Sequence, residues 1–102
     1  MNTIDQARIR REALRWLIIL TLNNARPVGA FEGPILSVAQ AEYPDATAME
    51  LRRELDYLHD RELVRVDKQP SGRWFAELSR FGVDVAEYTV PCEPGIARPA
   101  KY

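Results

Sequence analysis

The segment LRRELDYLHDRELVRVDKQPSGRWFAEL (Leu51–Leu78) is the part of the sequence that says most about the fold, because its hydrophobic period changes partway along. Its first part repeats leucine at helical spacing, with Leu51, Leu55 and Leu58 on one face. LVRVD (Leu63–Asp67) then alternates apolar and polar residues as a half-exposed strand does, and RWFAEL returns after a Gln-Pro-Ser-Gly turn. The stretch therefore predicts a helix followed by a two-stranded hairpin.

Two further helical patterns precede this stretch. Residues 4–23 lack Gly and Pro and repeat apolar residues at helical spacing. A breaker-rich connection follows, with room for a short extended piece, and a second helix is expected over residues 33–43, starting at Gly-Pro and ending at Tyr-Pro. Thr47 has the capping-box spacing to Glu50 and is expected to begin the third helix, which runs to about Arg61.

The chain after the hairpin divides into a short helix and a tail. Ser79 is expected to cap a helix that continues through about Tyr88. Three prolines then exclude helix from the rest of the chain. We expect one domain over residues 1–89 and a Pro-rich tail over residues 90–102, and the sequence leaves open whether the tail packs on the domain.

This order of elements predicts an α+β, mainly α fold of the winged helix-turn-helix type, with three helices, a two-stranded wing, a short C-terminal helix and an extended tail. The segments LRRELDYLHDRELVRVD and SGRWFAELSRFGVDVAEY resemble the wing region of small bacterial regulators of the arsenic-repressor and multiple-antibiotic-repressor families. Glu62 stands where a turn glycine is usual in those families, and Ser79 stands where threonine is usual. A cysteine pair for thiolate metal sensing is absent from the third helix.

A narrower resemblance extends over nearly the whole chain. The arginine-rich first helix, GVDVA and the closing VPCEPGIARP are similar to uncharacterised winged-helix proteins of Mu-like phages and prophages, and Gly95–Pro99 is the most distinctive piece. This resemblance implies a phage or prophage origin and a DNA-binding, regulator-like role. It implies no catalytic residues.

The length and the net charge of the chain limit the functions that it can have. One hundred and two residues suffice for one domain, and a formal net charge of -1 argues against indiscriminate coating of nucleic acid. The charge is unevenly distributed, with a net +3 over residues 1–26, -5 over residues 27–62 and +2 over residues 63–80. The helix-turn-helix is therefore the acidic part of the chain, which opposes contact with phosphates.

The candidate DNA-binding residues follow from the expected docking of the third helix in the major groove of double-stranded DNA. The arginines of the first helix, from Arg8 to Arg15, add a basic stretch. On the recognition helix the candidates are Thr47, Ala48, Glu50, Arg52, Arg53 and Tyr57, and on the wing they are Lys68, Ser71 and Arg73.

The first helix is apolar around more of its circumference than a core-facing stripe requires. One interpretation is a homodimer through the first and last helices, and the other is that the C-terminal helix of the same chain covers the excess. The candidate dimer-interface residues are Trp16, Ile19, Leu20 and Tyr88.

Other functions have weaker support in the sequence. The acidic third helix leaves a protein-interaction adaptor that does not bind DNA as the alternative. His59 and Cys92 are the only residues of their kinds, so we expect no catalytic site, no metal site and no cofactor. The single cysteine and the short apolar runs favour the cytoplasm of a bacterial host and no membrane segment.

Overall fold

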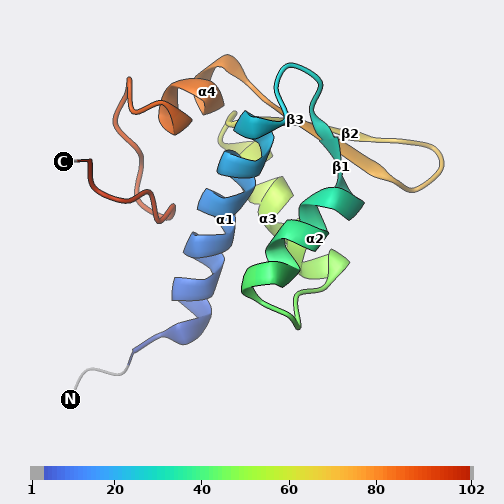
Figure 1. Ribbon diagram of the computed structural model, residues 1–102, viewed down its shortest axis with the longest axis horizontal. Coiled ribbons are helices and arrows are strands. Elements are labelled where there is room, and N and C mark those ends of the chain that lie inside the picture. The colour runs from blue at the N-terminus through green and yellow to red at the C-terminus, as the bar shows by residue number, and fades with distance from the viewer. Residues whose placement is uncertain (1–3, 102) are drawn as a thin grey trace.

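The computed structural model describes residues 4–101, which form four helices and three strands (Figure 1). Asp5 caps the first helix by accepting a hydrogen bond from the backbone N–H of Arg8 at 3.0 Å. The elements are α1 (Gln6–Asn24), β1 (Ala30–Phe31), α2 (Glu32–Glu42), α3 (Ala48–Asp60), β2 (Val64–Lys68), β3 (Trp74–Leu78) and α4 (Arg80–Ala86).

The strands form one antiparallel sheet in the order β1-β3-β2. The register of the hairpin pairs Val64 with Leu78 and Lys68 with Trp74. The short extended piece expected before the second helix is β1, which pairs with β3 and makes the sheet three-stranded. The hairpin projects from the helices at the right of Figure 1, whereas α4 and the C-terminal segment lie at the left.

The helix boundaries agree with the sequence patterns except at the start of α2. Thr47 caps α3 as expected, because its side chain accepts a hydrogen bond from the backbone N–H of Glu50 at 3.2 Å. Helix α2 begins at Glu32, two residues before the proline that was expected to occupy its first position. Proline is tolerated there because the N–H groups of the whole first turn have no partner within a helix.

The junction between α3 and the wing has a tight geometry. Glu62 adopts a left-handed backbone with φ 63°, which accounts for the glycine usual at this place in the regulators that the chain resembles. The Ser79 hydroxyl donates a hydrogen bond to the Glu62 carbonyl at 2.6 Å and accepts one from the Gly82 N–H at 3.0 Å. A Cβ at Gly82 would collide with the Leu63 carbonyl, so α4 packs closely on this junction.

Two clusters of buried side chains form the core. The larger joins all four helices and the hairpin, and the smaller joins α1, α2 and the residues before α3. Leucines 51, 55 and 58 all belong to the larger cluster, as their helical spacing predicts. No helix within residues 4–101 has the length and apolar character needed to cross a membrane.

The C-terminal segment packs on the domain, which the sequence had left open. Ile96 belongs to the larger core cluster, and the Ala97 N–H donates a hydrogen bond to the Glu12 carbonyl at 3.1 Å. The Tyr88 hydroxyl donates to the Pro99 carbonyl at 2.8 Å. We call residues 90–101 the C-terminal strap. With the hairpin as the wing and α3 as the recognition helix, the architecture is the expected winged helix-turn-helix.

Candidate nucleic-acid interface

The outward face of α3 carries few acidic side chains near its N-terminus. Thr47 and Ala48 are exposed where the helix begins, and Met49 is 73% exposed. Arg53 lies one turn further along, is exposed, and makes no hydrogen bond or ion pair with any residue in the described range 4–101. A free guanidinium on this face can donate two hydrogen bonds to a guanine or contact a phosphate.

The wing adds two cations to this side of the molecule. The Lys68 Nζ lies 3.2 Å from a carboxylate oxygen of Asp56 and 4.4 Å from the centre of the Trp74 ring. Arg73 is exposed, and its guanidinium stacks on the Phe31 ring at 3.8 Å. Aromatic contacts of this kind hold a cation in place while they leave its hydrogen-bond donors toward solvent.

Arg52 joins the recognition helix to the wing. Its guanidinium donates two hydrogen bonds of 2.7 Å to the Glu32 carboxylate and one of 2.7 Å to the Gly72 carbonyl in the wing turn. The Glu32 carboxylate also accepts a hydrogen bond from the Trp74 N–H at 2.6 Å. The hydrogen bond from Arg52 keeps the pKa of Glu32 below its usual value, so the pair stays ionised. Arg52 therefore holds the wing turn against α3, and its guanidinium is already engaged within the protein.

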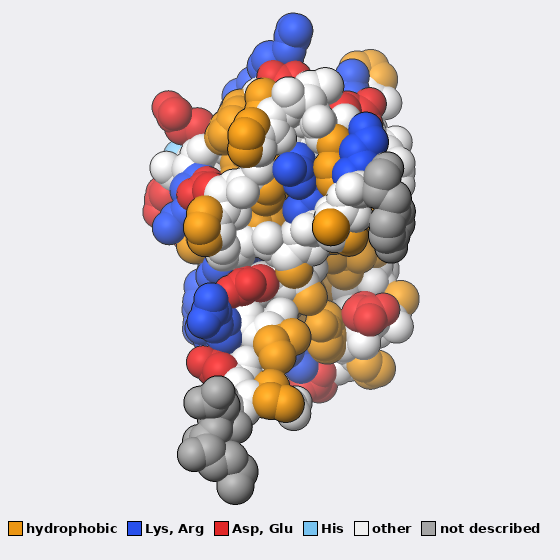
Figure 2. Space-filling model, turned by 90° about the vertical axis from the view of Figure 1, so that its left-hand side faces the viewer, with side chains coloured by type: hydrophobic (Ala, Val, Ile, Leu, Met, Phe, Trp, Pro, Cys, Tyr) orange, Lys and Arg blue, Asp and Glu red, His pale blue; other side chains and the backbone are white. Residues whose placement is uncertain are grey.

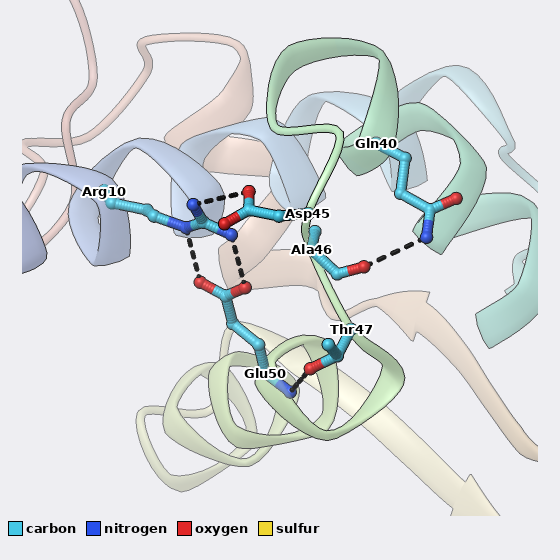
Figure 3. A network of polar contacts seen from close by, with 6 residues as sticks. All are labelled: Arg10, Gln40, Asp45, Ala46, Thr47 and Glu50. Atoms are coloured by element: carbon cyan, nitrogen blue, oxygen red, sulfur yellow. Dashed lines mark hydrogen bonds and ion pairs between the residues drawn. The ribbon is translucent and has the colours of Figure 1, made fainter.

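Glu50 does not face the groove side, contrary to the prediction. Its carboxylate accepts hydrogen bonds of 2.7 and 2.8 Å from Arg10 of α1, and Arg10 also donates to Asp45 at 2.9 Å (Figure 3). Both carboxylates raise the pKa of Arg10, and Arg10 lowers the pKa of Asp45. Glu50 turns toward α1 because its position on the helix lies beside the leucine stripe rather than opposite it.

Tyr57 was also wrongly placed in the groove-facing set. The centre of its ring lies 3.4 Å from the guanidinium carbon of Arg15 and 3.6 Å from that of Arg61. The neighbouring Glu54 is only 1% exposed and accepts a hydrogen bond from Arg15 Nε at 2.8 Å. Arg15 also donates to the Gly95 carbonyl at 2.9 Å, so this edge of α3 is covered by α1 and the C-terminal strap.

The basic stretch of α1, which the sequence suggested as an addition to the DNA-binding surface, is largely paired with carboxylates of the same chain. Arg10 and Arg15 are paired with α3, and Arg8 pairs with Glu12 on its own helix at 2.8 Å. These contacts bring the positive block of α1 against the negative block of α3. The acidic character of the helix-turn-helix is thus compensated within the fold, and the outward face of α3 is less acidic than its sequence indicates.

The four candidate dimer-interface residues do not form one exposed group. Ile19 is 0% exposed in the core, so its assignment to an interface is wrong, since the single chain already covers it. The rings of Trp16 and Tyr88 meet edge to face with centroids 6.1 Å apart, so α1 and the residues after α4 partly cover each other. Leu20 remains exposed.

Met49 and Glu32 belong to this site but are not among the residues predicted from the sequence. Met49 lies opposite the leucine stripe of α3, so helical periodicity could have found it. Glu32 is contributed by α2 and reaches both α3 and the wing, so it has no signal in local spacing.

The comparisons with known proteins bear on the fold. No protein-family model matches the chain, and no curated protein sequence does. Among solved structures, the chain is similar to a proposed DNA-binding protein from Ralstonia eutropha JMP134, with a TM-score of 0.64 and 24% sequence identity. The match covers 76% of this chain and 95% of that one. At this identity the likeness shows a shared fold, and that fold agrees with a winged helix-turn-helix.

Proposed function

We propose that this chain is a regulator-like protein that binds double-stranded DNA through the N-terminal half of α3 and the wing. The observation that carries the proposal is the separation of charge around α3. Glu50 and Glu54 are paired with α1, whereas Arg53 is free on the outward face among residues 4–101. The fold shared with a proposed DNA-binding protein supports the same reading.

In the proposed complex, α3 enters the major groove and the wing meets the backbone beside it. Arg53 is the candidate for base readout, and Thr47, Ala48 and Met49 offer small or apolar contacts to a thymine methyl group. Arg73 and Lys68 of the wing are candidates for phosphate contacts. Because Arg52 ties the wing turn to α3, the two elements are presented to DNA as one rigid surface.

The test is selection of bound sequences from a random duplex library with the purified full chain, followed by fluorescence anisotropy on the selected duplex. We expect one sequence family to be enriched and the affinity to fall as salt rises. Arg53→Ala should weaken binding about tenfold or more, as expected for loss of a guanine contact. The matched control is Arg80→Ala, which removes an exposed cation from α4, at the opposite end of Figure 1 from the wing.

Two outcomes would contradict the proposal. Failure to enrich any duplex at low salt would favour the alternative function, a protein-interaction adaptor. Equal losses from Arg53→Ala and Arg80→Ala would mean that binding is a general charge effect with no defined face.

We further propose that the protein acts as a homodimer in the cytoplasm of a bacterial host and is of phage or prophage origin. The outer side of α1 supports the dimer, since Ile9 is 55% exposed and Leu20 lies three turns further along. Hydrophobic side chains also gather in the lower half of Figure 2, where the N-terminal half of α1 lies. A dimer would place two recognition helices about 34–36 Å apart, one turn of DNA.

Sedimentation equilibrium tests the dimer independently of DNA. We expect the full chain to have twice the mass of one protomer and Ile9→Asp to have the mass of one. A wild-type chain that remains monomeric at high micromolar concentration would contradict the dimer and leave DNA binding as a separate question.

A further inference from the structure

The C-terminal strap lines a shallow, open hollow that the proposed DNA contact does not use. Hydrogen bonds close the loop at its neck, where Arg98 Nη1 donates to the Val90 carbonyl at 2.9 Å and to the Val85 carbonyl at 3.0 Å. The space within has a volume of about 620 Å³ and opens to solvent. Pockets that hold small molecules have volumes of about 300–1,000 Å³, so this hollow is large enough for one.

The lining combines apolar walls with two cations. Val90, Ile96 and several prolines supply the walls, and Arg98 and Lys101 supply the positive charge. Figure 2 shows basic side chains recessed among hydrophobic and backbone atoms in its upper half, on the face that carries the strap. Apolar walls with a few placed charged groups are typical of sites for small organic ligands.

Both cations contact the ring of Tyr88. The Arg98 guanidinium lies 4.3 Å from the centre of the Tyr88 ring, and the Lys101 Nζ lies 5.6 Å from the same point. Arg98 and Lys101 both line the hollow, and two cations in one lining give it a positive potential. The positive potential of the hollow therefore favours a negatively charged ligand.

The acidic residue of the lining does not cancel this potential. Glu93 is the carboxylate that lines the hollow, and it pairs at 3.5 Å with Arg61 of the α3–β2 turn. Burial raises the pKa of Cys92, the thiol in the lining, so the thiol is neutral and does not repel an anion.

Arg98 retains hydrogen-bonding capacity for a ligand. Only its Nη1 donates to protein carbonyls, and the remaining N–H groups of the guanidinium have no acceptor among residues 4–101. A planar guanidinium with free donors matches a carboxylate, to which it can donate two parallel hydrogen bonds.

From this geometry we propose that the hollow of the C-terminal strap is a binding site for a small organic acid, with its carboxylate at Arg98 and Lys101 and its apolar body against the proline and aliphatic walls. The volume supports an organic acid over a bare inorganic ion, because an ion would leave the apolar walls uncovered. This site is independent of the proposed DNA-binding function, and either can fail without the other.

The experiment is isothermal titration calorimetry of the full chain with sodium benzoate, with benzamide as the uncharged ligand of the same shape. We expect benzoate to bind at least about tenfold more tightly than benzamide, since the carboxylate alone gains charge-assisted hydrogen bonds. Two-dimensional NMR of the same samples should place the shifted amides within residues 88–101.

A matched pair of variants localises the site. Ala100 lines the hollow, whereas Ala97 is exposed outside its lining, so Ala100→Asp and Ala97→Asp add the same charge at two places in the strap. Ala100→Asp should weaken benzoate binding about tenfold by repulsion, and Ala97→Asp should leave it nearly unchanged. Lys101→Gln should weaken it as well.

Three results would overturn the proposal. Absence of benzoate binding at millimolar concentration would exclude the site, and equal affinity for benzamide would exclude the role of the cations. Inorganic phosphate that binds more tightly than benzoate would replace the organic acid with a simple anion. Unaltered circular dichroism spectra of the variants ensure that a loss of binding reflects the site rather than unfolding.

Discussion

The two sides of α3 use charge in opposite ways. On the side toward α1, Glu50 and Glu54 are paired with arginines, and Glu54 is almost completely buried. On the outward side, Arg53 is exposed and has no partner among residues 4–101. Net charge along a segment therefore says little about the charge of a face, because helical periodicity sends neighbouring residues to different environments.

The two sides of α3 differ most at the buried ion pair of Arg15 and Glu54, where we expect the largest effect. Arg15→Met leaves the buried Glu54 carboxylate without its partner, and breaking such a pair lowers the free energy of unfolding by about 3–5 kcal/mol. Urea unfolding followed by circular dichroism measures the loss. The double variant Arg15→Met with Glu54→Leu should recover the part that is due to the uncompensated charge, whereas the loss of the Arg15 contacts with Tyr57 and the Gly95 carbonyl remains. A single-variant loss below about 1 kcal/mol would show that water reaches Glu54.

The C-terminal strap covers the same side of α3. A variant that takes Ile96 of the strap out of the core therefore tests how much this side depends on the strap. Ile96→Ala should lower the free energy of unfolding by about 2–4 kcal/mol, because it leaves a cavity in the larger core cluster. Val28→Ala is the control, since Val28 is an exposed aliphatic residue. If both variants unfold at the same urea concentration, the strap contributes nothing to the core.

The two sides of α3 should also respond in opposite ways when one arginine is removed from each. Arg53→Ala should weaken binding to the selected duplex about tenfold and leave the urea midpoint unchanged. Arg10→Ala should do the reverse, lowering the midpoint with little effect on DNA affinity, because Arg10 holds Glu50 and Asp45. Anisotropy and urea unfolding of both variants measure the two effects. If Arg10→Ala weakens DNA binding as much as Arg53→Ala does, the two sides are not separate.

The smallest expected effect concerns the junction of α3 with the wing and depends on pH. Hydrogen bonding to Arg52 lowers the pKa of Glu32 from its usual 4.5, so its stabilisation is present above pH 4.5 and disappears as pH falls through the lower folded-state value. Glu32→Gln should cost about 1–2 kcal/mol at pH 7. The difference from wild type should shrink as pH falls below 4.5 in urea unfolding series. Glu87→Gln, at an exposed position after α4, is the control, and its stability difference from wild type should not change with pH. A Glu32→Gln difference that stays the same at every pH would show that ionisation of Glu32 does not stabilise the fold.

Much of the fold was predictable because it depends on local patterns. The leucine spacing of α3, the alternation in the hairpin and the caps at Thr47 and Ser79 each act within a few residues. The outward position of Arg53 follows from the same periodicity. The placements of Glu50 and Tyr57 were wrong because they lie to one side of the leucine stripe, where a neighbouring helix decides what they face.

The remaining contacts join residues far apart in the chain. The hydrogen bond from Arg15 to the Gly95 carbonyl spans 80 residues, and no spacing rule connects them. Gly95 has φ 102°, and a Cβ there would collide with the Tyr57 hydroxyl, so this glycine is needed for the strap to approach α3. The sequence marked the Gly95–Pro99 piece as distinctive, but its partners emerged only in three dimensions.

The docking of Ile96 has a consequence for the order in which the protein can mature during translation. A domain folds as a unit when its core is complete, and this core takes one of its members from nearly the last part of the described chain. A nascent chain that still holds Ile96 inside the ribosome lacks both that side chain and the Gly95 carbonyl for Arg15. The final consolidation of α1 against α3 therefore waits until the strap has emerged.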